Sequence, residues 1–270
     1  MQRRILIIDD HNDLAEALDE VFTHTGHEVD VVVDRDSALA LDDITGYDIV
    51  ITDLDVEPAA AAPDANGDAP HCLPRFDAEA AVEERIKAFK ICASNFRRDE
   101  QFDEDELNSF FATILDYKIR FVDSEENVRD LHENIEFELP SAVSLMHVIL
   151  EYLMKRVEKL GVCKPDQNNL YIALDEAFVN AVKHGNKFDV AKLVRVVADI
   201  SSREARFTIE DEGEGFDVNN IPDPLDPANL FKPSGRGVLF IYNIMDEVKY
   251  NDRGNRLTMV KRSEAEPVIE

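Results

Sequence analysis

Three side chains that could act together on a phosphate group recur at intervals of four residues in the second half of the chain. They are Glu176, Asn180 and His184, in a stretch whose apolar residues have helical spacing. Residues four apart on a helix drift by only about 40° per step, so the three line one strip. Asn180 can offer an oxygen to Mg²⁺, and Glu176 can accept a proton from an attacking hydroxyl. His184 has a second interpretation, because a cation is also favoured where a helix ends before a glycine such as Gly185.

Two glycine clusters follow this helix in the sequence. Gly213 and Gly215 come directly after a predicted strand, beside Asp211. A carboxylate at Asp211 can accept a hydrogen bond from the exocyclic amine of adenine, and glycines let a base approach the backbone. Gly235 and Gly237 open a predicted amphipathic helix, whose first N–H groups and positive dipole end favour a phosphate group. Together the clusters predict a nucleotide site.

The residues between the glycine clusters are rich in proline, aspartate and asparagine, which is typical of a loop. We interpret residues 219–233 as a mobile lid over the nucleotide. Lys232 and Arg236 are candidates for phosphate contacts at its end, and a solvated surface charge is the alternative for each.

A second group of carboxylates lies near the N-terminus. Asp9 and Asp10 follow one short apolar run, and Asp53 follows another. Short strands alternate with helical stretches here, which predicts a parallel β-α-β arrangement whose strands end at one edge. Three converging carboxylates need a cation, so we expect Asp9, Asp10 and Asp53 to bind Mg²⁺, with Asp53 as a candidate phosphoryl acceptor. The alternative is that each aspartate merely ends a strand in a turn.

The first 57 residues resemble the amino-terminal half of a response-regulator receiver domain. By that resemblance Asp9 and Asp10 are the acidic pair and Asp53 is the phosphoacceptor. The sequence then departs from the family, because no counterpart of the fourth and fifth receiver strands is recognisable and Lys118 is not followed by proline. A truncated receiver used for packing or dimerisation is the alternative to a phosphorylated one.

The middle of the chain is interpreted as a linker over residues 58–76 and a helical connector over residues 77–133. Apolar residues in the first part of the connector alternate by four and three, the spacing of a coiled-coil seam. They are Val82, Ile86, Phe89, Ala93 and Phe96. A second amphipathic helix over residues 107–115 is predicted, with Asp103 as its cap. The connector either pairs two chains in a homodimer or packs onto its own domain.

Further elements are predicted in the second half. A helix from about residue 141 to Leu160 precedes the helix that carries Glu176, and strands are expected over residues 193–200, 205–209 and 257–260. His132 precedes a stretch that alternates like a strand, so we expect a solvated turn histidine there rather than a phosphoacceptor.

The ordered motifs of the second half strongly resemble the GHKL-type ATPase fold. They are Glu176-x-x-x-Asn180-x-x-x-His184-Gly185-Asn186, then Asp211-x-Gly213-x-Gly215-Phe216, then Gly235-x-Gly237. The sequence Asn-Ala-Val-Lys-His-Gly-Asn over residues 180–186 looks most like the corresponding motif of the anti-sigma-factor serine kinases. The resemblance covers roughly residues 138–262.

This resemblance implies a mixed α/β protein. A two-layer α+β sandwich of the histidine-kinase-like ATPase type is expected over residues 134–262, after a partial doubly wound receiver-like segment, with an acidic tail over residues 263–270. By the resemblance Glu176 is the base, Asn180 the Mg²⁺ ligand and Asp211 the adenine reader. The other residues expected to cradle the nucleotide are Lys183, His184, Gly213, Gly215, Lys232, Gly235, Arg236 and Gly237.

The function implied by the resemblance is an ATP- and Mg²⁺-dependent protein serine/threonine kinase of the anti-sigma type. Its partners would be an anti-sigma antagonist, a sigma factor, or both, and a sensor histidine kinase could supply input through the receiver-like segment. A non-catalytic ATP-binding interaction module and an atypical histidine kinase are the alternatives.

The length and net charge of the chain limit the number of domains and the classes of partner that we expect. A chain of 270 residues suggests two domains, or one with an extension. Its 29 Lys and Arg against 57 Asp and Glu give a net charge of −28, which repels nucleic-acid phosphates and anionic lipids. We therefore expect no nucleic-acid and no membrane partner.

Compartment is inferred from the cysteines and from the absence of long apolar runs. Cys72, Cys92 and Cys163 form no C-x-x-C pair, so we expect isolated thiols in a reducing compartment, with neither disulfides nor a zinc cluster. No run approaches the roughly 18 residues of a membrane span, and the start is too short for a signal peptide. The expected location is the cytoplasm.

Overall fold

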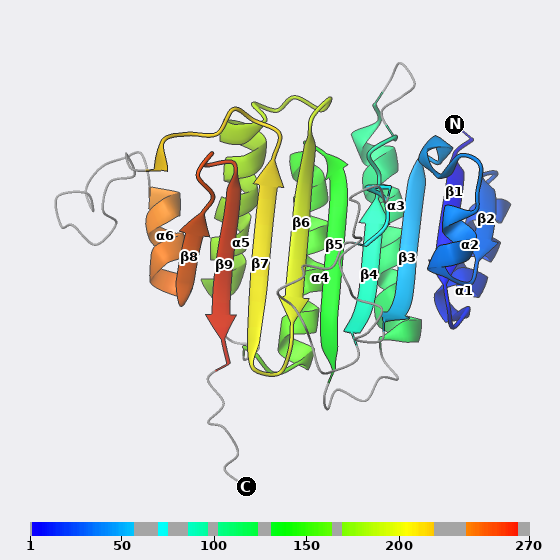
Figure 1. Cartoon of the computed structure of the whole chain (residues 1–270), viewed down its shortest axis with the longest axis horizontal. Coiled ribbons are helices and arrows are strands. Elements are labelled where there is room, and N and C mark those ends of the chain that lie inside the picture. The colour runs from blue at the N-terminus through cyan, green and yellow to red at the C-terminus, as the bar shows by residue number, and fades with distance from the viewer. Residues whose placement is uncertain are drawn as a thin grey trace, which may run out of the picture. The chain divides into compact units, whose positions relative to one another are not determined.

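The chain is organised as two compact units, Met1–Pro140 and Ser141–Glu270. The structure, a computed structural model, describes residues 2–56, 70–74, 86–96, 102–123, 131–163, 169–218 and 236–263, and for Phe121 and Arg236 it describes the backbone. Figure 1 labels the strands and helices and colours them from blue at the N-terminus to red at the C-terminus.

The first unit is built on five strands in the order β2-β1-β3-β4-β5. They are β1 (Arg4–Asp9), β2 (Glu28–Val32), β3 (Ile49–Val56), β4 (Ile86–Cys92) and β5 (His132–Pro140). Strand β1 is parallel to both of its neighbours, β4 is antiparallel to β3, and β5 is parallel to β4. The β-α-β arrangement expected near the N-terminus is thus present, but the sheet beyond β3 is not the parallel continuation of a receiver.

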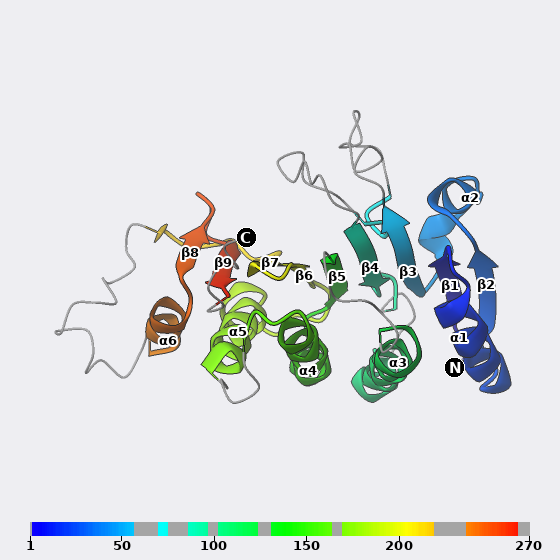
Figure 2. The ribbon, with the colours of Figure 1, turned by 90° about the horizontal axis from the view of Figure 1, so that it is seen from below.

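Helices cover both faces of this sheet. Helices α1 (Asp13–His24) and α3 (Glu104–Tyr117) lie on one face and the short α2 (Arg35–Leu39) lies on the other (Figure 2). The described part of the unit also contains two short elements, a 3₁₀ turn at Ile44–Gly46 and a π-helical turn, η2, at Lys118–Val122. Strands covered on both sides need apolar side chains on both sides, which explains the continuous run of buried isoleucine and leucine in β1.

Strand β4 corrects an expectation from the sequence. The coiled-coil helix expected within residues 77–98 is wrong over Ile86–Cys92, which form a strand between β3 and β5. In a strand buried on both faces the apolar residues follow no period of two, so their chance spacing by three and four imitated a helix. The second helix expected in the connector is confirmed as α3, and the Asp103 carboxylate accepts a hydrogen bond from Glu106 N at 3.0 Å as its cap. His132 begins β5 rather than occupying a turn.

The second unit has four strands in the order β6-β7-β9-β8, and the pairs are antiparallel. They are β6 (Leu193–Ile200), β7 (Glu204–Asp211), β8 (Glu247–Tyr250) and β9 (Arg256–Arg262). The strands expected over residues 193–200, 205–209 and 257–260 are confirmed. Strand β8 was not predicted, because its four residues are too few to show a periodic pattern.

Three helices lie on one face of this sheet, α4 (Val143–Lys159), α5 (Asn169–Asn180) and α6 (Arg236–Ile244), as Figure 2 shows. Helix α5 continues into a π-helical turn, η3, at Ala181–Gly185. In β6 every second residue is buried, the alternation expected of a strand with helices on one face only. The result is the two-layer α/β arrangement expected for this half of the chain. In the part of the chain that the structure describes, no helix is long and apolar enough to cross a membrane.

Candidate nucleotide-binding site

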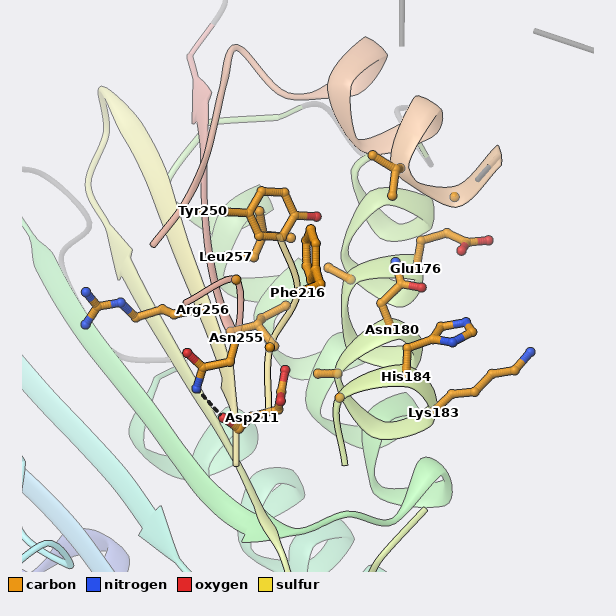
Figure 3. A pocket seen from close by; sticks show the side chains of 18 residues that line it. Glu176, Asn180, Lys183, His184, Asp211, Phe216, Tyr250, Asn255, Arg256 and Leu257 are labelled. Carbon is orange, nitrogen blue, oxygen red and sulfur yellow. Dashed lines mark hydrogen bonds between the residues drawn. The ribbon is translucent and has the colours of Figure 1, made fainter. Parts of the chain in front are cut away.

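A cavity of about 680 Å³ opens in the second unit between the helices and the sheet. Its volume lies in the range of about 300–1,000 Å³ typical of small-molecule sites. The lining residues come from α5, η3, the ends of β7 and β8, the start of α6 and β9 with the turn before it (Figure 3). They are Glu176, Ala177, Asn180, Ala181, Lys183, His184, Gly185, Ile209, Asp211, Gly215, Phe216, Gly237, Val238, Tyr250, Gly254, Asn255, Arg256 and Leu257.

One wall of the cavity is the helical strip expected from the sequence. Figure 3 shows Glu176, Asn180 and His184 following one another along α5 and η3. Glu176 and Asn180 are partly buried, whereas Lys183 and His184 are exposed, and the Lys183 side chain points away from the sheet in Figure 3. The carboxylate and the carboxamide are therefore held at the wall, and the two basic residues lie at the rim.

The end of this helix is in close contact with Asp211. In η3 the Asn186 N–H donates to Ala181 O at 2.8 Å, a bond that spans five residues and is characteristic of a π-helical turn. A Cβ atom at Gly185 would clash with the Asp211 carboxylate. Gly185 is thus required by this close approach, and not only as a helix terminator.

Asp211 ends β7 and is held in place by its neighbours. Its carboxylate Oδ1 accepts a hydrogen bond from Gly213 N at 2.8 Å, and its backbone oxygen accepts one from Asn255 Nδ2 at 2.7 Å. Asp211 is 9% exposed, and burial raises the pKa of its carboxyl above the ordinary range. The backbone bonds fix the position of the side chain and leave carboxylate acceptor capacity at the cavity wall.

Gly215, which lines the cavity, and Gly254 bring two backbone segments together. Gly215 and Gly254 have positive φ angles of 77° and 78°, a conformation that other residues rarely adopt. A Cβ at Gly215 would clash with Arg253 O, and one at Gly254 would clash with Phe216 O. Gly213 is buried, and it does not line the cavity in the described part of the chain.

Asn186 joins the helix end, the sheet and the glycine segment, and its positioning role was not recognised in the sequence. It is fully buried. Its Nδ2 donates to Ser141 Oγ at 2.6 Å and to Leu193 O at 2.8 Å, while its Oδ1 accepts a hydrogen bond from Glu212 N at 2.9 Å. The sequence signal was its place at the end of the 180–186 motif.

Two aromatic residues add an apolar wall that sequence reasoning also missed. Phe216 and Tyr250 meet edge to face, with ring centroids 5.2 Å apart, and both line the cavity. Burial raises the pKa of Tyr250 to about 12, so it is a neutral phenol at physiological pH. Phe216 is 45% exposed and presents ring surface on which a planar base can pack.

The start of α6 reaches Glu176. A Cβ at Gly237 would clash with the Glu176 carboxylate, so the absence of a side chain allows the helix start to approach the acid. Helix α6 packs on α5. Lys232, Gly235, the side chain of Arg236 and the whole of the expected lid, residues 219–233, lie outside the described residues.

Of the aspartates near the N-terminus, Asp9 ends β1 and Asp10 follows it, whereas Asp53 lies within β3 and not at the strand end expected from the sequence. Asp9 and Asp53 are register partners on the parallel strands β1 and β3. Both Asp9 oxygens accept backbone hydrogen bonds at the start of α1, from the N–H groups of His11, Asn12, Leu14 and Ala15 at 2.8–3.1 Å. Asp10 Oδ2 accepts a bond from Asp55 N at 2.9 Å. Asp9 therefore serves as a cap for α1.

Asp53 forms a buried ion pair that the sequence analysis discounted. Lys118 Nζ lies 2.7 Å from Asp53 Oδ2 and 3.2 Å from Asp123 Oδ1, and the side chains of all three residues are at most 3% exposed. Asp53 Oδ1 has no hydrogen-bond partner among the described residues. Burial outweighs the Lys118 charge and raises the pKa of Asp53 to about 6.

The variant Asp53→Asn tests the cost of this burial. The folded protein holds the Asp53 proton between pH 3.8 and about 6, where the unfolded chain has lost it. Below this pH window the protonated Asp53 carboxyl makes its full contribution to the free energy of unfolding. This contribution declines as the pH rises through the window, by up to about 3 kcal/mol. Urea unfolding followed by circular dichroism should show wild type losing stability relative to Asp53→Asn from pH 4 to 7.

The exposed Asp42 provides the matched control. The free energies of unfolding of wild type and Asp42→Asn should differ by a constant amount over the same pH range. If the free energies of unfolding of wild type and Asp53→Asn ran parallel from pH 4 to 7, Asp53 would be ionised in the folded protein over that whole range.

Comparison with known proteins finds similarity over the second unit. Residues 139–261 match the family of histidine kinase-like ATPase domains. The chain is 27% identical over 143 residues to the serine-protein kinase RsbW of Bacillus cereus (strain AH820), of Bacillus anthracis (strain A0248) and of Bacillus thuringiensis (strain Al Hakam). The aligned residues are 50% of this chain and 89% of each relative. The domain match and this identity support a GHKL-type ATPase domain, similar to that of a serine-protein kinase, over residues 139–261.

Proposed function

We propose that the chain is an ATP-dependent protein serine/threonine kinase of the anti-sigma type. The observation that carries this proposal is the cavity itself, where Glu176 and Asn180 on one wall are combined with Asp211 on another. The similarity to serine-protein kinases over residues 139–261 supports the same reaction.

Adenine would bind at the end of the cavity formed by Asp211, Phe216 and Tyr250. The Asp211 carboxylate accepts a hydrogen bond from the exocyclic amine, and the two rings provide an apolar surface for the base. Because Asp211 is already fixed by Gly213 N and Asn255 Nδ2, little ordering accompanies binding.

The phosphates would lie between the helical strip and the start of α6. Oxygen donors suit Mg²⁺, and Asn180 supplies an uncharged one at the cavity wall, so the residues present fit this ion. Bound Mg²⁺ would neutralise phosphate charge. The first N–H groups of α6 suit phosphate oxygens, and Lys183 and His184 at the rim are further candidates.

Glu176 is proposed as the general base. Its carboxylate would accept the proton of a serine hydroxyl on the partner protein while that oxygen bonds to the γ-phosphorus and ADP leaves. A pure binding module would need no carboxylate at this point of the wall. An atypical histidine kinase is disfavoured, because His132 lies in β5 and not on a helix.

The partner is proposed to be an anti-sigma antagonist, with a sigma factor as the alternative binding partner. This step rests on the resemblance of residues 180–186 to the anti-sigma-factor serine kinases and on the similarity to the serine-protein kinase RsbW.

Glu176→Gln should greatly slow phosphoryl transfer but preserve nucleotide binding. The amide keeps the size of the side chain and removes the proton acceptor, so transfer should fall about 10²–10⁴-fold. The measurement is transfer of radiolabel from ATP to a candidate antagonist, with ATP affinity measured by calorimetry. Asp175→Asn, on the same helix but not lining the cavity, is the control and should retain activity.

Unchanged transfer by Glu176→Gln would refute the assigned base. Acid-stable phosphate on the product is expected for serine chemistry, and acid-labile phosphate would instead support the histidine kinase alternative.

Asp211→Asn should weaken ATP binding and reduce discrimination against GTP. The charge-assisted hydrogen bond to the adenine amine is lost, which should lower ATP affinity about tenfold to hundredfold. Calorimetry with both nucleotides measures the effect. The exposed Asp252, in the neighbouring turn, gives the control variant Asp252→Asn, whose ATP affinity should stay at the wild-type value. Equal ATP affinity in Asp211→Asn would remove the adenine-reading role.

We also propose that the first unit supplies input through Asp53. A carboxylate beside Asp9 in the sheet, paired with Lys118 and with an oxygen that lacks a described partner, supports a phosphoryl acceptor. Asp10 would help to hold Mg²⁺ there, whereas Asp9 is occupied by the amides of α1. A sensor histidine kinase would be the physiological donor.

Acetyl phosphate or beryllofluoride should change the nucleotide affinity or the oligomeric state of the full chain. In the acetyl phosphate reaction the Asp53 oxygen bonds to phosphorus and acetate leaves. Calorimetry and light scattering measure the two properties, and Asp53→Ala should not respond. If treated wild type also shows no change, the segment has a structural role only.

A further inference from the structure

A nitrogen, a sulfur and an oxygen donor meet in the first unit, away from the carboxylates already described. They belong to His71 in the described loop 70–74, Cys92 at the end of β4 and Glu138 in β5. His71 Nδ1 lies 2.7 Å from Glu138 Oε1, and Cys92 Sγ lies 3.9 Å and 3.8 Å from these two atoms. Three residues that are far apart in sequence therefore form one group of potential ligands.

The sheet itself fixes two of the three donors. Cys92 and Glu138 are register partners on the parallel strands β4 and β5, and Ala93 N donates to Glu138 O at 2.8 Å. Cys92 is 2% exposed and Glu138 is 8% exposed. The sulfur and the carboxylate are thus held side by side with little freedom to separate.

A fully buried lysine holds the third donor in place. Lys90 Nζ donates to His71 O at 2.5 Å and to Leu73 O at 3.1 Å, and it pairs with Glu136 Oε1 at 2.6 Å. These bonds fasten the loop that carries His71 to β4 and β5. The loop position therefore does not depend on the His71 side chain, which is 42% exposed and open to solvent.

The distances between the three donor atoms fit an ion that binds four ligands tetrahedrally with short bonds. Zinc bonds of about 2.0–2.1 Å to nitrogen or oxygen and about 2.3 Å to sulfur give ligand separations of about 3.3–3.6 Å. The two separations that involve Cys92 Sγ are within a few tenths of this range. The contact between His71 and Glu138 is shorter and would open by about half an ångström as the ion replaces their hydrogen bond.

We propose that His71 Nδ1, Cys92 Sγ and Glu138 bind one Zn²⁺ ion. Thiolate and imidazole ligands favour zinc over Mg²⁺. On binding, the Cys92 thiol and the His71 Nδ1–H group that donates to Glu138 each release a proton to solvent, so the thiolate and the Glu138 carboxylate contribute two negative charges that the ion neutralises. The fourth position would be taken by water or by Ser94 Oγ, which lies 3.4 Å from Cys92 Sγ. The ion would fasten the 70–74 loop to the sheet of the first unit.

The test uses the full chain after treatment with a chelator. Titration with Zn²⁺ against a chromophoric competitor should show one tight site. Titration with Co²⁺ should give a thiolate-to-metal charge-transfer band together with the visible bands of a four-coordinate ion. Zn²⁺ should also raise the midpoint of thermal unfolding, and its affinity should increase with pH because a thiol proton is released.

Cys92→Ser should remove the charge-transfer band, and Cys92→Ser, His71→Gln and Glu138→Gln should each weaken Zn²⁺ binding by more than about 100-fold. Cys163→Ser controls for the loss of a buried thiol and should bind as wild type. The half-exposed His71 gives a variant that should keep its fold, so a failure of Cys92→Ser to fold does not prevent the test.

His11→Gln distinguishes this site from the group formed by Asp10, His11 and Asp55, whose donor atoms also lie close together. It should leave the Co²⁺ spectrum unchanged. Loss of binding in His11→Gln with normal binding in His71→Gln would overturn the proposal, as would the absence of a Zn²⁺ site in wild type. Neither result would bear on the nucleotide site, because all three ligands lie in the first unit.

Discussion

The close approach of a helix end to a buried carboxylate is the constraint on which the nucleotide site depends. At Gly185 the α5–η3 helix touches the Asp211 side chain, and there is no space between them for even one methyl group. Asn186 then ties the same helix end to β6 and to the segment after β7. The strip that carries Glu176 and Asn180 is therefore placed relative to Asp211 by contacts at its end.

Both units consist of a sheet with helices, but they differ in whether one or both faces of the sheet are covered. This difference determines how easily the strands can be predicted from the sequence. In the second unit helices lie on one face of the sheet, and β6 alternates between buried and half-buried residues. Such a strand is recognisable from its sequence. In the first unit both faces are covered, and β4 is a run of mostly buried residues, two lysines among them, without alternation of apolar and polar side chains. That run was mistaken for a helical seam.

Most of the second unit could be predicted, and so could the residues of the candidate site that line the cavity together, because each motif there is local. Glu176, Asn180 and His184 share one helix, and Asp211 is next to its glycines in sequence. The features that were missed join distant parts of the chain. Lys118 meets Asp53 across 65 residues, and His71 meets Glu138 across 67. No periodic pattern in a single sequence records such pairings, so the cysteines were expected to be isolated.

The π-helical turn at Ala181–Gly185 limits how this chain can change in length. One residue more than in a regular α-helical turn is accommodated there, as the bond from Asn186 N to Ala181 O shows. Deleting that residue would restore the regular turn, in which the same two groups are bonded four residues apart, and would leave Gly185 and Asn186 facing β7. A residue deleted from the regular helix α5 would instead rotate everything beyond it by about 100° around the helix axis. A length difference among relatives that keep the same site is therefore expected in this turn and not within α5.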